Sequence, residues 1–87
     1  MVKEKLRIQI SEINPDALIF DNPSFDNSII GISSTGRVIY DLEKMVEELS
    51  EEDNMQEEDA RDFIDFNTLR TIPYIGENSP IVLENLL

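Results

Sequence analysis

The sequence predicts a single α+β domain over residues 1–87, in which a helical pair packs on a small sheet. Two β-branched segments, at 28–33 and 37–40, flank a short glycine-containing loop and indicate a β-hairpin. Apolar residues recur with helical spacing over 41–70 and indicate two consecutive helices. A small sheet has one face to bury, and the apolar stripes of two helices meet that need.

The amino-terminal segment is expected to form a helix that ends at Ile13. Leu6, Ile10 and Ile13 fall on one helical face, although the alternation of apolar residues from Leu6 to Ile10 fits a strand equally well. We favour the helix because Asn14 precedes Pro15, and a residue before proline is biased away from helical geometry.

Residues 16–40 are expected to hold a short strand and the hairpin. The apolar run at 16–20 is typical of a buried strand or a short extended segment. The sequence Phe-Asp-Asn then occurs twice, at 20–22 and 25–27, which predicts an Asx-turn loop that its phenylalanines fix to the core. Gly31, inside the first hairpin strand, predicts a bulge or a close approach by another element.

Residues 41–71 are expected to form an antiparallel helical hairpin. Asp41 is a natural N-cap, Asn54 can adopt the left-handed conformation that ends the first helix, and Pro73 stops the second. The apolar face of the first helix comprises Leu42, Met45, Val46 and Leu49. That of the second comprises Ala60, Phe63, Ile64 and Asn67, extended by Phe66 and Leu69.

Residues 72–87 are expected to form a carboxy-terminal extension. Its last seven residues include five aliphatic side chains, namely Ile81, Val82, Leu83, Leu86 and Leu87. Such a tail either adds a strand to the sheet or covers an apolar groove on this chain or on a neighbour. A homodimer is therefore a second expectation.

Charge is concentrated in the helical hairpin. Residues 41–70 hold 12 of the 19 acidic residues against three basic ones, so they carry −9 of the net charge of −12. This charge opposes direct binding to nucleic acid or to an anionic membrane, and it favours a protein partner with a basic surface.

The amino-acid composition limits the kinds of catalytic and metal-binding site that the chain can form. The chain has no cysteine and no histidine, which excludes disulfides and thiolate metal sites and removes the usual general base near neutral pH. We expect no catalytic residues, cofactor or metal, and hence no enzyme. No apolar run is long enough for a signal peptide or a membrane span, so a cytoplasmic location is expected.

A longer pattern carries a resemblance. It consists of INPDALIFD at 13–21, VIYDLEKMVEEL at 38–49, EDNMQEEDARDFIDFNTLR at 52–70 and PYIGENSP at 73–80. The chain resembles a group of short uncharacterised proteins of bacteria, archaea and their phages, which implies a phage or prokaryotic context and no catalytic residues. Asn54 and Gln56 depart from the group, which has glycine and serine or threonine there, and imply less well terminated helices.

Eight residues are candidates for binding a partner: Glu47, Glu48, Glu51, Glu58, Tyr40, Tyr74, Leu83 and Leu86. For the acidic ones the simpler interpretation is a solvated face that keeps a small domain soluble. Asp21, Asn22, Asp26 and Asn27 carry oxygen ligands suited to a divalent cation, but they lack the spacing of a calcium loop, and Asx-turns are the simpler interpretation. Glu52, Asp53 and Asn54, with Glu57 to Asp59 following, are another weak candidate for a cation site, and a purely structural role is again the simpler interpretation. Asn67 is expected to be partly buried and to tie the second helix to a neighbouring segment.

The function expected from the sequence is that of a non-enzymatic protein-interaction module, phage or prophage related. The alternative is an inhibitor that mimics nucleic acid, because carboxylates on successive helical turns lie about 5–6 Å apart and occupy basic grooves. A carboxylate-based metal enzyme is the third class.

Overall fold

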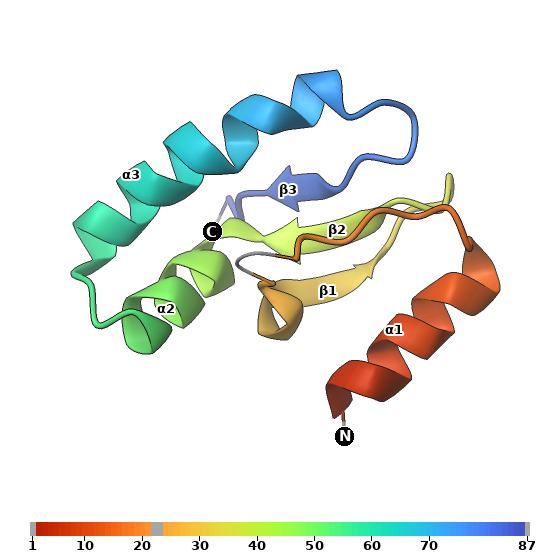
Figure 1. Ribbon diagram of the computed structural model, residues 1–87, viewed down its shortest axis with the longest axis horizontal. Helices are drawn as coiled ribbons and strands as arrows, with labels where there is room; N and C mark the ends of the chain where they lie inside the picture. The colour runs from red at the N-terminus through yellow and green to blue at the C-terminus, as the bar shows by residue number, and fades with distance from the viewer. Residues whose placement is uncertain (1, 22–23, 87) are drawn as a thin grey trace.

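A computed structural model describes residues 2–21 and 24–86 of the chain. Its helices are α1 (Val2–Ile13), α2 (Leu42–Glu52) and α3 (Glu57–Asn67), with two short 3₁₀ helices, η1 (Asp26–Ser28) and η2 (Leu69–Tyr74). Its strands are β1 (Ile29–Ile32), β2 (Val38–Asp41) and β3 (Ile81–Leu83), in the order β1-β2-β3. In Figure 1, α1 lies near one end of the sheet, and α2 and α3 lie near the other. The α+β class is confirmed.

The amino-terminal helix was predicted correctly, whereas the short strand expected after it is absent from the described structure. α1 ends at Ile13 as expected, and it buries Ile10 while Leu6 packs against the core. Residues 17–20, by contrast, form no strand. The segment is irregular, although the backbone N–H of Leu18 donates to the carbonyl of Asn78 at 3.2 Å and Phe20 packs on the core.

The hairpin is confirmed, with antiparallel β1 and β2. The pairing register shifts between Ile29 and Gly31, so the expected bulge is present. A Cβ at Gly31 would meet nothing within 4 Å, so the other expectation, a close approach, is wrong. The loop closes through Gly36, whose φ of 82° is the left-handed backbone that glycine adopts without strain.

Both ends of α2 follow the prediction. The Asp41 carboxylate accepts a hydrogen bond from the backbone N–H of Lys44 at 3.1 Å and so caps the helix. At the other end Asn54 has a φ of 53°, and the Ser50 hydroxyl donates to the carbonyl of Met55 at 2.6 Å. These contacts reverse the chain, so that α3 runs back alongside α2 (Figure 1).

α3 is shorter than expected. It ends at Asn67 and continues as η2, which contains Pro73, so proline does not itself end the α-helix. Its buried face is Ala60 and Ile64, whereas Phe66 is 58% exposed, with the Arg70 guanidinium 4.4 Å from its ring centroid.

The carboxy-terminal extension adds a strand, which is the first of the two expected possibilities. β3 pairs in parallel with β2, with Ile39 opposite Ile81 and Tyr40 opposite Val82. Parallel neighbours need a long crossover connection, and α2, α3 and η2 supply it. One buried cluster joins the elements: Ile10, Phe25, Val38, Tyr40, Leu42, Met45, Val46, Leu49, Ala60 and Ile64.

Candidate functional site

The exposed surface of α2 and α3 is acidic and largely unneutralised. Glu47, Glu51 and Glu58 are all exposed, as the sequence predicts. Among the described side chains, only Glu43 of the hairpin acids forms an ion pair, with Arg61 at 2.8 Å. The exposed carboxylates of the two helices other than Glu43 are therefore available to an outside cation.

A hollow of about 240 Å³ interrupts this surface between α2 and η1. It is lined by Asn27 from η1 and by Lys44, Glu47, Glu48 and Glu51 from α2. The short orange coil of η1 lies beside α2 in Figure 1, which is how a loop residue comes to line a helix face. Because three carboxylates face one ammonium group, the hollow keeps a net negative charge.

Glu48 differs from the acids around it because it is only 8% exposed. The Ser28 hydroxyl donates to its Oε1 at 2.8 Å, and no described group donates to its buried Oε2. The expectation that Glu48 belongs to the open acidic face is therefore wrong. It lies three residues after Met45, at the edge of the apolar stripe, and η1 covers it there.

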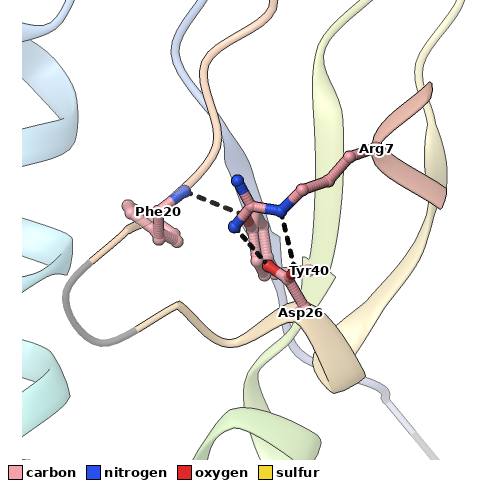
Figure 2. A network of polar contacts seen from close by, with 4 residues as sticks. All are labelled: Arg7, Phe20, Asp26 and Tyr40. Atoms are coloured by element: carbon pink, nitrogen blue, oxygen red, sulfur yellow. Dashed lines mark hydrogen bonds and ion pairs between the residues drawn. The ribbon is translucent and has the colours of Figure 1, made fainter. Parts of the chain in front are cut away.

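A second polar network fixes α1 and the loop to the sheet (Figure 2). The Arg7 guanidinium donates from Nε and Nη2 to the two carboxylate oxygens of Asp26, at 2.8 and 3.0 Å. The Asp26 side chain is 3% exposed and that of Arg7 40%, so the pair closes over the buried acid. These hydrogen bonds raise the pKa of Arg7 above its usual value.

Tyr40 belongs to the core instead of the surface. Its side chain is fully buried, its ring centroid lies 4.8 Å from that of Phe20, and its hydroxyl accepts the Phe20 backbone N–H at 3.0 Å (Figure 2). Burial raises the pKa of Tyr40 to about 12. The expectation that Tyr40 contacts a partner is wrong, because the central strand of the sheet directs it inward.

The other apolar candidates remain at or near the surface. Tyr74 is 89% exposed and Leu86 is 94% exposed, whereas Leu83 is half-buried within β3. Asn67 is exposed and donates to the carbonyl of Phe63 in its own helix, so the expectation that it ties α3 to another segment is wrong. Thr68, which is 5% exposed, takes the buried position instead.

The structure gives the Phe-Asp-Asn repeat a different role from the expected Asx-turns, and no Asx-turn hydrogen bond is found at its described residues. Asp26 is used by Arg7 and Phe25 is buried, while Asn22 lies outside the described residues. Over residues 2–21 and 24–86 no three carboxylates come close enough to hold a metal ion together, and this includes the acids around Asp53.

Sequence reasoning missed Arg7, Ser28 and Arg37 as organising residues. Arg7 sits between Leu6 and the rest of the apolar face of α1, and that position is the only signal in the sequence. Arg37 donates from Nε to the carbonyl of Ser79 at 2.7 Å and from Nη2 to its hydroxyl at 3.0 Å. These partners lie far away in the sequence, so no local pattern marks them.

The fold defines an α+β domain with an acidic helical face. Comparison of the chain with protein-family models, curated proteins and solved structures finds no match. None of the helices in the described part of the chain is long and apolar enough to cross a membrane.

Proposed function

We propose that this protein is a non-enzymatic interaction module that binds a basic protein surface through the acidic face of α2 and α3. The observation that supports it is the set of exposed carboxylates without an intramolecular cation, of which Glu47, Glu51 and Glu58 are representative. A complementary basic surface gains attraction from all of them at once. The resemblance to prokaryotic and phage proteins suggests a partner in the cytoplasm of a prokaryotic host.

The test compares two variants of equal net charge. In the first, Glu47, Glu51 and Glu58 are changed to lysine. The second variant changes three other exposed acids to lysine: Glu4 and Glu12 of α1, and Glu77 in the loop between η2 and β3. Tagged wild-type protein is used to capture partners from prokaryotic lysate at about 100 mM salt and is then washed at about 500 mM, which shortens the screening length from about 10 Å to under 5 Å.

We expect the wild type and the second variant to capture the same partner and the first variant to lose it. The high-salt wash should release the partner from the wild type. Capture that survives the changes on α2 and α3 would refute it. So would equal loss in both variants, because total charge and not the acidic face would then decide binding.

Mimicry of nucleic acid is the second candidate, and the exposed carboxylates at Glu47 and Glu51 favour it because they stand one helical turn apart. It requires the captured partner to be a nucleic-acid-binding enzyme. A DNA or RNA duplex added to the purified complex should then displace this protein. If the duplex does not displace this protein from the complex, mimicry of nucleic acid is refuted, and binding to a basic protein surface is the better explanation.

A further inference from the structure

The sheet has two faces, and only one of them packs against the core. Side chains alternate between the faces along a strand, so Val38 and Tyr40 of β2, both fully buried, point to one face and Ile39 points to the other. Val38 and Tyr40 belong to the core cluster, whereas Ile39 neither belongs to it nor packs against it. The face that carries Ile39 is therefore separate from the core.

β3 continues this second face. Ile81 pairs with Ile39, and the alternation along the strand places Leu83 on the same side as Ile81. Both side chains are partly exposed and neither packs against the core cluster, whereas Val82 between them does. Leu83, a candidate for binding a partner, is thus part of a sheet face.

The bulge in β1 adds two more residues to this face. The register shift places both Ile30 and Gly31 opposite Ile39, while Ile29 and Ile32 on either side pack against the core. Ile30 is 44% exposed, and a Cβ on Gly31 would meet nothing within 4 Å in the described structure. We call the five residues that share this side the open sheet face: Ile30, Gly31, Ile39, Ile81 and Leu83.

The open sheet face carries no charge, although the net charge of the chain is −12. The acidic helices lie on the other side of the sheet, since Met45 of α2 and Ile64 of α3 belong to the core cluster together with Tyr40. A basic partner gains no attraction from a surface without carboxylates, so the occupant of this face has to be uncharged and apolar itself. The same face of a second copy meets this requirement, and a two-fold axis brings the two faces together.

We propose that the open sheet face is the contact between two copies of this chain in a two-fold symmetric dimer. The two sheets stack at about 10 Å, as in a β-sandwich, and the acidic helices of each copy lie on the outer sides. These helices are then more than about 20 Å apart, over twice the screening length of about 8 Å at physiological salt. The dimer leaves both acidic faces free, and it does not depend on the proposed function.

The size of the face determines how strong the dimer is. Its strands have four, four and three residues. Such a sheet measures about 13 by 14 Å, or about 200 Å². Stable interfaces bury about 800 Å² on each partner, so this dimer belongs to the weak and transient class. We therefore expect association at protein concentrations of about 100 µM and above.

Sedimentation equilibrium of the full chain from about 20 µM to about 1 mM, at about 50 and about 500 mM NaCl, measures this association. The interface variant is Ile30→Glu, which places a charge on the open sheet face. The matched control is Ile8→Glu, which adds the same charge on α1, where Ile8 is 58% exposed. If circular dichroism shows that Ile30→Glu does not fold, Ile30→Thr and Ile8→Thr provide an uncharged pair, because threonine is also β-branched and suits a strand.

We expect a reversible wild-type dimer that is tighter at high salt, because salt screens the repulsion between two acidic chains. Ile30→Glu should weaken dimerisation at least about tenfold, since the dimer would bury a charge without a partner. Ile8→Glu should change it less than about threefold, as expected for one exposed charge. Ile30→Thr should weaken it more than Ile8→Thr does. In a mixture of ¹³C-labelled and unlabelled chains, NOEs between copies should involve the methyl groups of Ile39, Ile81 and Leu83.

Three results would overturn the assignment. A wild type that stays monomeric at every concentration and at both salt levels would refute the dimer and leave the face to another apolar partner. Equal weakening by the matched changes at Ile30 and Ile8 would place the contact elsewhere on the chain. Dimerisation that weakens with salt would indicate an electrostatic contact. Partner capture by the acidic face is released by salt, so the opposite salt dependence separates the two proposals.

Discussion

The contact between Arg7 and Asp26 shows how one pair of side chains can hold an element in place. Asp26 is buried, and both of its carboxylate oxygens accept from the same guanidinium. Removing the cation leaves a desolvated negative charge, and that penalty exceeds the net stabilisation that the intact pair provides.

Arg7→Met should therefore lower the free energy of unfolding by about 2–4 kcal/mol, since one buried charge loses its partner. Urea denaturation followed by circular dichroism measures it. The matched change is Lys5→Met, which removes one exposed charge from the same helix and should alter stability by less than about 0.5 kcal/mol. Similar losses in the two variants would mean that Asp26 does not depend on Arg7.

Tyr40 links stability to alkaline pH. Burial raises its pKa to about 12, above the unfolded value of about 10, so between these values the folded state keeps a proton that the unfolded state has lost. The unfolded state then binds fewer protons, and stability falls as pH rises, by up to about 1.4 kcal/mol per pH unit.

Tyr40→Phe should remove this component of the decline between about pH 10 and pH 12. At pH 7 it should reduce stability by about 1–2 kcal/mol, because the Phe20 backbone N–H loses its acceptor. Urea denaturation at several pH values gives both quantities. Identical slopes in the two proteins would show that the pKa of Tyr40 is the same in the folded and unfolded states, so that burial does not raise it.

The turns and caps explain why the elements begin and end where they do. Asp41 caps α2 with Oδ1 and accepts from the Asn85 side chain with Oδ2 at 2.6 Å, so one carboxylate joins the start of α2 to the segment after β3. At the hairpin loop, the Asn14 side chain donates to the carbonyl of Gly36 at 2.9 Å and to Asn78 at 3.2 Å. Three chain segments therefore meet at Gly36.

Gly36→Ala should destabilise the protein by at least about 1–2 kcal/mol, because alanine is strained at positive φ. The new Cβ would also approach the Asn14 Nδ2 atom to 2.9 Å. Gly31→Ala is the control, since that position has free space, and it should be neutral or slightly stabilising. Thermal unfolding of both variants provides the comparison, and a Gly36 variant as stable as the Gly31 variant would contradict this account of the turn.

For the molecule as a whole, charge repulsion is the dominant electrostatic effect. The net charge is −12, and the described side chains contain two ion pairs, so added salt screens more repulsion than attraction. The same repulsion opposes the homodimer suggested by the apolar tail, in which Leu86 is 94% exposed.

Raising NaCl from about 20 mM to about 500 mM should therefore increase the melting temperature by about 2–5 °C. The change should be smaller when Glu47, Glu51 and Glu58 are all replaced by glutamine, because less repulsion remains to be screened. Differential scanning calorimetry measures both. A melting temperature that falls with salt would mean that attractive pairs outweigh the repulsion.

The parts of the fold that could be predicted are those whose cause lies within a few residues. The hairpin follows from two β-branched segments around Gly36, the start of α2 from Asp41, and its end from Asn54. Each is a local backbone preference or a hydrogen bond to a near neighbour in sequence, and a linear pattern records such causes.

What the sequence could not show depends on which distant segments meet. The parallel pairing of β3 with β2, the burial of Tyr40 by the loop at Phe20, and the cover of Glu48 by η1 all join residues far apart in the chain. The sequence alone shows the acidic composition of α2. Helical periodicity places Glu48 at the edge of the apolar stripe of α2, where it could face either the core or solvent. Only the position of η1 decides between the two. The burial of Glu48, with one carboxylate oxygen that has no donor among the described groups, is therefore a consequence of packing.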